Sequence, residues 1–200
     1  PYYMYYHTSW GAVSGDGGDH GMAINLSDHH FLWAYFIFPA AVLASYDSQF
    51  VEDYGDMVEL LIRDAMNPDK DDMRNFDVYE GHSWAGGYGD NNSGNNQESA
   101  SEATFAWAGL YLWGLVTGNN TYRDAGIWGY TSEVDAIEQY WFNMDAGTVT
   151  TGHRDMEQMY MAMKIVMFFH TQEWYGDLDI QMVHTSQEIH AVSWVFIYFL

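Results

Sequence analysis

The stretch DHHFLWAYFIFPAAVLASY, residues 28–46, decides the class of the fold. It is longer than an ordinary strand and contains many apolar helix formers, so it predicts a helix that is buried on most sides. Pro39 lies within this stretch and is expected to kink the helix or to divide it in two. A helix of this kind needs other elements to cover it.

The sequence that follows repeats the helical pattern. Ser48–Met66 places apolar residues at the i, i+3, i+4, i+7 spacing and stops at Asn67-Pro68. Gly118-Asn119 is expected to form the turn between two later helices, the second of which has Asn120 as its N-cap. Beyond residue 66, the ranges expected to be helical are about 99–116, 122–143, 155–169 and 186–200.

Two segments lack this pattern. Residues 1–26 are rich in Tyr, Gly, Asp and Ser without periodicity, which predicts an irregular leading segment. Residues 67–97 form a long polar connection, and a connection of this length within a domain is usually functional or disordered. No alternating strand pattern and no βαβ rhythm is visible. We therefore expect an all-α fold of antiparallel helix pairs joined by loops, in one domain over residues 1–200.

The charge balance limits the partners. The chain has 28 acidic residues against 6 Lys plus Arg, a formal net charge of −22. Such a field repels nucleic acid and anionic membrane surfaces, whereas a neutral polymer meets no such repulsion. Aromatic residues make up 18% of the chain, with nine Trp and sixteen Tyr. This surplus is typical of rings that stack on sugars, and equally of an aromatic core.

Cysteine is absent, which excludes disulfides, thiolate metal sites and cysteine nucleophiles. The chain begins with Pro1 and shows no signal peptide, so we expect a processed chain or a fragment. The apolar stretch over residues 191–200 is too short to cross a bilayer.

The octet NQESASEA, residues 96–103, is the strongest candidate for chemistry. Glu98 and Glu102 are four residues apart at the start of a predicted helix, which would put both on one face. A helix N-terminus favours negative charge, so two carboxylates there are also stable without a function. Their position directly after the long polar loop favours a site.

Two further pieces contain polar side chains of the kind that active sites use. Asp28-His29-His30 opens the first helix, where Asp28 is either an N-cap or, with the histidines, a metal ligand. A DHH triplet also marks manganese-dependent phosphoesterases, but these need an α/β domain that is not expected here. The run Tyr79-Glu80-Gly81-His82-Ser83-Trp84 offers an imidazole, a hydroxyl and a stacking ring, or simply packing residues. No nucleophile elbow surrounds Ser83.

In this order and at these spacings, the three pieces resemble glycoside hydrolase family 81, the endo-β-1,3-glucanases or laminarinases. The similarity continues through AGLYLWGLVTG and EVDAIEQYWF and returns weakly at QEIHAVSW. The stretches that carry it are NLSDHHF at 25–31, VELLIRDAMNPD at 58–69, RNFDVYEGHSWAGG at 74–87 and NNQESASEA at 95–103.

The resemblance implies part of an (α/α)6 barrel with long active-site loops, and inverting cleavage of β-1,3-glucan outside the cell without metal or cofactor. The family's acid aspartate falls on Asp28, its essential histidine on His82, and its glutamate pair on Glu98 and Glu102, one of which is the base. The residues expected to contact glucan are His82, Trp84, Tyr79, His29, His30, Asn96, Gln97, Glu188 and His190.

Three departures from the family pattern matter. After DHHF the family usually continues His-Tyr-Gly-Tyr, whereas this chain has Leu32-Trp33-Ala34-Tyr35. The C-terminal glycan-contacting motif is only partly present, as Glu188-Ile189-His190. About six helices and no β-sandwich make the domain incomplete relative to the family, and exposed helix faces then favour self-association. A non-catalytic glucan-binding or self-assembling relative, and a metal-dependent hydrolase using Asp28 and the histidines, stay as alternatives.

Overall fold

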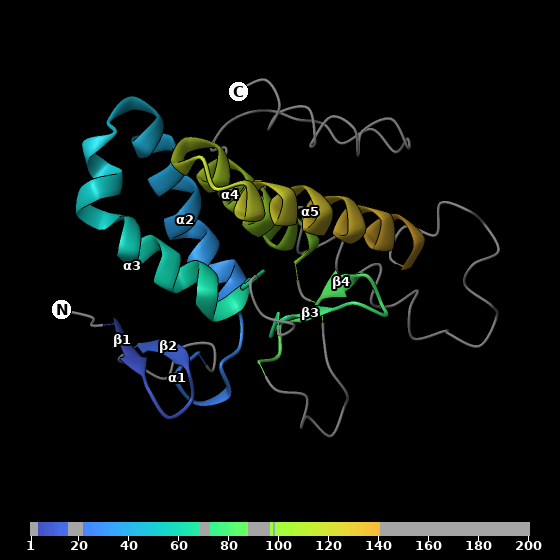
Figure 1. Cartoon of the computed structure of the whole chain (residues 1–200). Coiled ribbons are helices and arrows are strands. Elements are labelled where there is room, and N and C mark those ends of the chain that lie inside the picture. Colours follow the sequence, from blue (N-terminus) through green and yellow to red (C-terminus); the bar gives the residue numbers. More distant parts are fainter. Residues whose placement is uncertain (1–3, 16–21, 69–72, 88–96, 98, 141–200) are drawn as a thin grey trace, which may run out of the picture. The chain divides into compact units, whose positions relative to one another are not determined.

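The computed structural model describes residues 4–15, 22–68, 73–87, 97 and 99–140, all within one compact unit (Figure 1). The helices expected over residues 155–169 and 186–200 lie outside the described residues. The elements are β1 (Met4–His7), β2 (Ala12–Gly15), α1 (Met22–Asn25), α2 (His29–Tyr46), α3 (Gln49–Ala65), β3 (Phe76–Asp77), β4 (His82–Ser83), α4 (Ala100–Thr117) and α5 (Asn120–Tyr140). The described part is mainly helical, which confirms the all-α class.

Two small antiparallel hairpins are the main difference from the expected fold. β1 pairs with β2 from Met4↔Gly15 to His7↔Ala12, so the prediction of an irregular leading segment was wrong there. β2 is buried along its whole length and β1 is largely exposed, so neither strand alternates between polar and apolar residues. β3 and β4 have two residues each, which is too short for a periodic signal.

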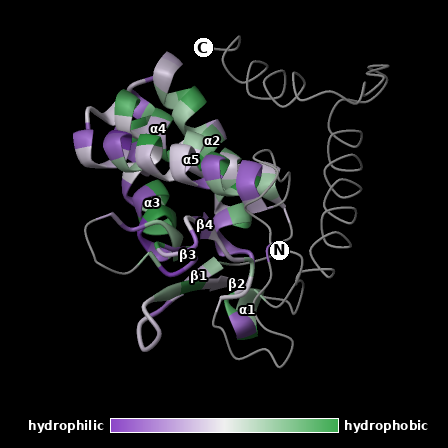
Figure 2. Cartoon of the chain, turned by 90° about the vertical axis from the view of Figure 1, so that its right-hand side faces the viewer, coloured by the Kyte–Doolittle hydropathy of each residue, from purple (hydrophilic) through white to green (hydrophobic). Residues whose placement is uncertain are grey.

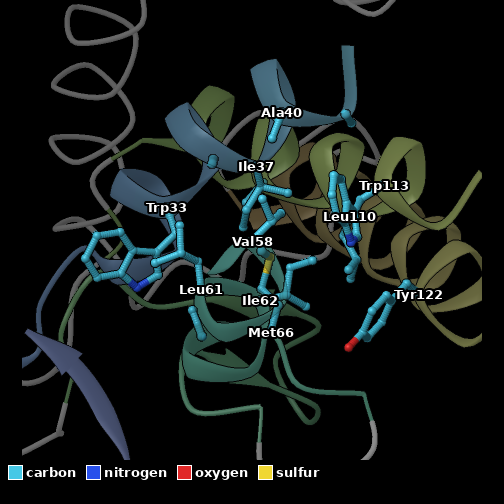
Figure 3. Close-up of a cluster of buried hydrophobic side chains, with 14 of the residues drawn as sticks. Trp33, Ile37, Ala40, Val58, Leu61, Ile62, Met66, Leu110, Trp113 and Tyr122 are labelled. Atoms are coloured by element: carbon cyan, nitrogen blue, oxygen red, sulfur yellow. The ribbon is translucent and has the colours of Figure 1, made fainter. Parts of the chain in front are cut away.

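The core is built where α2, α3 and α4 meet. Figure 3 shows Trp33 and Ile37 of α2 packed with Val58 and Ile62 of α3 and with α4, and all four side chains are buried. Figure 2 shows hydrophobic residues on α2 and α4 and several hydrophilic positions on α5. α2 is therefore buried where it faces α3 and α4, as the apolar stretch 28–46 predicts, whereas Phe36, Leu43 and Tyr46 are exposed.

The contacts between α2 and α4 show that the two helices run in the same direction. Phe31 of α2 packs with Ala103 of α4, the Phe38 and Phe105 rings lie 4.6 Å apart, and a Cβ at Gly109 would contact the Phe38 backbone. Positions further along α2 thus meet positions further along α4. Both helices consequently begin at the same end of this layer.

α5 runs back along α4 at close range. A Cβ at Gly126 would lie 2.5 Å from the backbone nitrogen of Tyr111, and one at Gly129 would lie 2.3 Å from the Trp107 ring. Since real Cβ atoms do not approach so closely, glycine is required at both positions for this packing. The close approach brings the C-terminal half of α5 over the first turns of α4.

The start of α5 corrects one detail of the predicted fold. Asn119, and not Asn120, caps α5, because its side-chain oxygen accepts the Tyr122 N–H at 3.2 Å. Gly118 takes the left-handed conformation, with φ 69°, that ends α4. Pro39 does not divide α2, which is one helix from residue 29 to 46 and packs against both α3 and α4. None of the described helices is both long and apolar enough to span a membrane.

Candidate active site

Asp28 stands at the N-cap position of α2 but does not cap the helix with its side chain. Its backbone is left-handed, with φ 61° and ψ 14°, and its carboxylate makes no capping hydrogen bond. The Asp28 N–H donates to the carbonyl of Ala85 at 2.8 Å, which joins the start of α2 to the loop that contains His82. A left-handed backbone is uncommon outside glycine, and Asp and Asn adopt it more readily than other residues. The N-cap interpretation therefore does not account for this aspartate.

A buried carboxylate on α3 holds the first turn of α2. Asp64 has a fully buried side chain and accepts hydrogen bonds from His29 Nδ1 at 2.6 Å and from Trp33 Nε1 at 2.5 Å. It also accepts the Val13 N–H at 3.0 Å and is paired with the Arg74 guanidinium. Burial raises the pKa of Asp64, but the His29 hydrogen bond and the charges of His29 and Arg74 outweigh it and leave the pKa below its usual value.

The two histidines that follow Asp28 are interior residues. His29 is 0% exposed, and its second ring nitrogen lies 3.1 Å from the Met22 carbonyl. His30 is 2% exposed and has no hydrogen-bond partner among the described residues, and its ring lies against Phe31. Burial, followed by the charges of His29 and Arg74, lowers the pKa of His30 to about 3. Sugar binding by either histidine stays a prediction, and both rings are part of the packed framework.

Glu102 lies in the first turn of α4. Ser99 caps this helix by accepting the Glu102 N–H at 3.3 Å, and Glu102 Oε1 accepts the Tyr35 hydroxyl of α2 at 2.7 Å. α4 begins at Ala100, and the expectation that both glutamates share one helical face stays a prediction. Glu98 itself lies outside the described residues. Tyr35 was not identified as a site residue from the sequence. Its position two helical turns after Asp28, on the same helix, is the signal that could have identified it.

The loop motif lies over α5, where it forms the hairpin of β3 and β4. His82 is 2% exposed and packs edge-on against the rings of Trp84 at 4.4 Å and Tyr140 at 5.8 Å. Its Nδ1 lies 2.8 Å from the Ser83 carbonyl, to which it donates. Burial lowers the pKa of His82, although its hydrogen bond to Ser83 and the nearby Glu80 and Asp77 oppose this shift. The imidazole is thus held neutral at neutral pH.

The turn of this hairpin carries the most exposed aromatic ring of the motif. Tyr79 is 94% exposed, whereas Trp84 is half-buried and donates its indole N–H to Asp77 at 3.3 Å. The Asp77 carboxylate accepts the backbone N–H groups of Tyr79 and Glu80 in this turn. The exposed ring is available for stacking on a sugar, and the Tyr79 assignment stays a prediction.

A second buried carboxylate, Glu133 of α5, was not anticipated from the sequence. It is 0% exposed and accepts hydrogen bonds from the Ser83 N–H and hydroxyl, the Gln97 amide and the Trp107 indole, at 2.9–3.2 Å. Burial raises the pKa of Glu133, and these donors oppose the shift. The signal for it is periodicity, because Glu133 falls on the buried face of α5 with Gly126, Gly129, Ala136 and Ile137.

The structure brings together only part of the predicted site. Asp28, the His82 loop and Glu102 all lie at the end where α2 and α4 begin. Gln97 is buried in the Glu133 cluster rather than at the surface, so its contact with glucan stays a prediction. Asn96, Glu188 and His190 lie outside the described residues. Among the residues that are described, no group of three His, Asp or Glu side chains could hold a metal ion.

Comparisons with known proteins point to one family. The family model of the glycosyl hydrolase family 81 C-terminal domain matches residues 1–191. A glucan endo-1,3-beta-D-glucosidase of Acetivibrio thermocellus is 47% identical over 159 residues, which are 75% of this chain and 21% of that protein. A glucan endo-1,3-beta-D-glucosidase of Thermobifida fusca is 39% identical over 157 residues, with the same coverage of 75% and 21%.

A solved structure agrees with this. The structure is a glycoside hydrolase family 81 protein from Clostridium thermocellum, in a glutamate-to-alanine variant. It matches with a TM-score of 0.70 and 45% sequence identity, over 74% of this chain and 22% of that one. The chain therefore spans about a fifth of the length of these relatives and shares the helical fold of that part of them.

Proposed function

The chain belongs to glycosyl hydrolase family 81, and on that basis we propose that it hydrolyses internal β-1,3-glucosidic bonds in β-glucans of the laminarin type. The observation that carries the proposal is the left-handed, non-capping Asp28, which lies at the same end of the helical layer as Glu102. Inverting glycosidases need two carboxyl groups that flank one bond.

In the proposed mechanism, Asp28 is the general acid and gives its proton to the glycosidic oxygen as the bond breaks. One glutamate of the pair Glu98 and Glu102 is the general base and takes a proton from the attacking water. Inversion requires the two carboxyl groups to stand about 6.5–9.5 Å apart, so that the water fits between base and sugar. Two features support these roles: Asp28 is held through its backbone by Ala85, and Glu102 is oriented by the Tyr35 hydroxyl.

His82 and Tyr79 complete the proposed glucan site. A neutral imidazole in a fixed orientation binds a sugar hydroxyl through hydrogen bonding, and an exposed tyrosine ring stacks on the apolar face of a glucose unit. The formal net charge of −22 does not oppose binding of a neutral polymer. Because such a polymer does not enter cells, the proposed place of action is extracellular.

The test is the release of reducing ends from laminarin, with carboxymethylcellulose as the control substrate. We expect the wild-type chain to cleave laminarin alone, and Glu98→Gln and Glu102→Gln to lower the rate, with the base variant losing about 10²–10⁴-fold. Glu52→Gln makes the same chemical change at an exposed position near the start of α3, at the opposite end of that helix from Asp64 and the start of α2, and should retain full activity. Equal rates in all three variants would show that neither glutamate is the base.

A second candidate is a glucan-binding or self-assembling relative without turnover. The observation in its favour is that α2 exposes apolar side chains: Phe36 at 47%, Leu43 at 54% and Tyr46 at 89%. Such side chains favour association with further copies of the chain or with more of the barrel. Size-exclusion chromatography with light scattering, together with a laminarin pull-down, distinguishes this candidate from the hydrolase. Binding and assembly without release of reducing ends would establish it.

A further inference from the structure

Asp64 lies one residue before the end of α3, and α3 ends beside the start of α2 (Figure 1). Its side chain is fully buried, and a buried carboxylate is unfavourable unless donors surround it. The carboxylate accepts hydrogen bonds from the Val13 N–H, His29, Trp33 and Arg74. Asp28 immediately precedes α2, and two of these four partners lead to it by separate routes.

The first route is the residue that follows Asp28 in the chain. His29 Nδ1 lies 2.6 Å from Asp64 Oδ2, and His29 Nε2 lies 3.1 Å from the Met22 carbonyl. The ring is 0% exposed, so it is held at both nitrogens and enclosed on all sides. Since His29 and Asp28 share a peptide bond, Asp64 restrains the backbone on the C-terminal side of Asp28.

The second route is the loop that precedes β3. Arg74 donates to the carboxylate of Asp64 and also to its backbone carbonyl. The next residue, Asn75, is joined to Trp84 by two hydrogen bonds: its carbonyl accepts the Trp84 N–H at 2.7 Å, and its side-chain amide donates to the Trp84 carbonyl at 3.2 Å. Ala85 follows directly. The pairing of Arg74 with Asp64 therefore restrains both ends of this loop.

The loop meets Asp28 at Ala85, whose carbonyl accepts the Asp28 N–H at 2.8 Å. Ala85 is buried and packs with Phe31 of α2 and Ala103 of α4, so the hydrogen bond is made inside the packed layer. Asp28 is thus held on one side through its own N–H and on the other side through His29. Both attachments lead back to one carboxylate.

We propose that Asp64 is a positioning residue for the general acid: by holding His29 and the Arg74 loop, it fixes the backbone of Asp28 and so directs the proton that Asp28 gives to the glycosidic oxygen. Asp64 acts through these neighbours, because its own side chain is fully buried. The consequence for turnover rests on the proposed function, whereas the consequence for the Asp28 backbone does not. A misplaced acid slows cleavage most where the leaving oxygen needs a proton.

The first measurement is amide hydrogen exchange of the full chain, taken as the ratio of the Asp28 rate to the Arg123 rate. The Arg123 N–H donates to the Asn119 carbonyl at the start of α5, so the ratio separates loosening at Asp28 from a general loss of stability. We expect Asp64→Asn to raise the ratio at least about 10-fold. Leu110→Ala is the matched control, since the cavity it leaves in the core should lower the melting temperature by a similar amount. Its ratio should not rise, and an unchanged ratio in Asp64→Asn overturns the proposal.

A second variant covers the case in which Asp64→Asn does not fold. Arg74→Gln removes the loop route alone and leaves His29 on Asp64. We expect it to raise the ratio of the Asp28 rate to the Arg123 rate at least about threefold. An unchanged ratio would again overturn the proposal.

The second measurement compares two substrates. On laminarin, Asp64→Asn should lower kcat by about 10- to 100-fold with KM within about twofold. On 2,4-dinitrophenyl β-laminaritrioside, whose leaving group departs without a proton, kcat should fall by less than about threefold. Equal losses on both substrates would indicate a structural role alone and overturn the proposal. A wild-type chain that cleaves neither substrate would refute the proposed function, and the exchange ratio would still decide whether Asp64 fixes Asp28.

Discussion

Asp64→Asn is expected to destabilise the chain strongly, because Asp64 joins four separate parts of the fold. Its carboxylate accepts from Val13 of β2, His29 and Trp33 of α2, and Arg74 before β3. The asparagine amide keeps the size but presents its own hydrogens to two of these donors. Removing one partner of a buried ion pair costs about 3–5 kcal/mol. For a domain of this size, each kcal/mol corresponds to about 2–4 °C, so we expect the melting temperature to fall by about 6–20 °C.

The assay is thermal unfolding followed by circular dichroism at pH 7, with Asp56→Asn as the matched control. Asp56 lies on the same helix with an exposed side chain, so its replacement should change stability by less than about 0.5 kcal/mol. A melting temperature for Asp64→Asn within about 2 °C of that control would refute the reasoning that this cluster holds the start of α2.

The same variant has a defined pH signature. The pKa of Asp64 is lowered in the folded chain, so its stabilising effect is present above the unfolded value of about 3.9 and is lost as the pH falls through the folded value. Asp64→Asn should therefore remove part of the acid sensitivity below about pH 4. If the unfolding free energies of the wild-type chain and the variant change equally with pH in this range, this assignment is contradicted.

Three further predictions follow from single contacts. The stability of His30→Leu should depend less on pH than that of the wild-type chain. The buried His30 ring has a pKa of about 3, so the wild-type chain loses up to about 1.4 kcal/mol of stability per pH unit as the pH falls from 6.5 towards 3. Urea unfolding at several pH values measures this dependence, and an unchanged slope in the variant refutes it. Asn119→Ala should lower the free energy of unfolding by about 1 kcal/mol through loss of the α5 cap, whereas Asn120→Ala should lower it by less than half as much. Urea unfolding midpoints measure both changes, and equal losses would contradict the assignment of the cap. Tyr35→Phe should leave the melting temperature within about 3 °C of the wild-type value. It should lower kcat on laminarin by about 10-fold, because Glu102 loses an orienting hydrogen bond. An unchanged kcat would exclude Tyr35 from the site.

The helices could be predicted from the sequence because their signals are local. The apolar run 28–46 and the periodic run 48–66 each differ from the observed helix by one residue at one or both ends. The β1–β2 hairpin could not be predicted in this way, since one strand is wholly buried and the other largely exposed, so the alternation that reveals a strand is absent from both. The cap of α5 differed by one residue, because Asn119 and Asn120 are equivalent in sequence and only the geometry of the turn selects between them.

The candidate site depended on motifs more than on periodicity. Asp28 and Glu102 were identified from their motifs, and the structure adds how each is held, by Ala85 and by Tyr35. Asp64 and Glu133 were not identified as important, although each is an acidic residue on the buried face of an amphipathic helix. Their partners lie 10 to 51 residues away in sequence and on other segments of the fold, so the hydrogen bonds that make them favourable are set by tertiary packing.

The most direct measurement for the proposed function is ¹H NMR of laminarin during hydrolysis by the wild-type chain and by Asp28→Asn. Asparagine tolerates the left-handed backbone at position 28, so the variant should fold while it lacks the acid. The account predicts that the α-anomer of the new reducing end appears first with the wild-type chain and that Asp28→Asn produces it at least about 100 times more slowly. No cleavage by the folded wild-type chain, a β-anomer as the first product, or full activity in Asp28→Asn would contradict it.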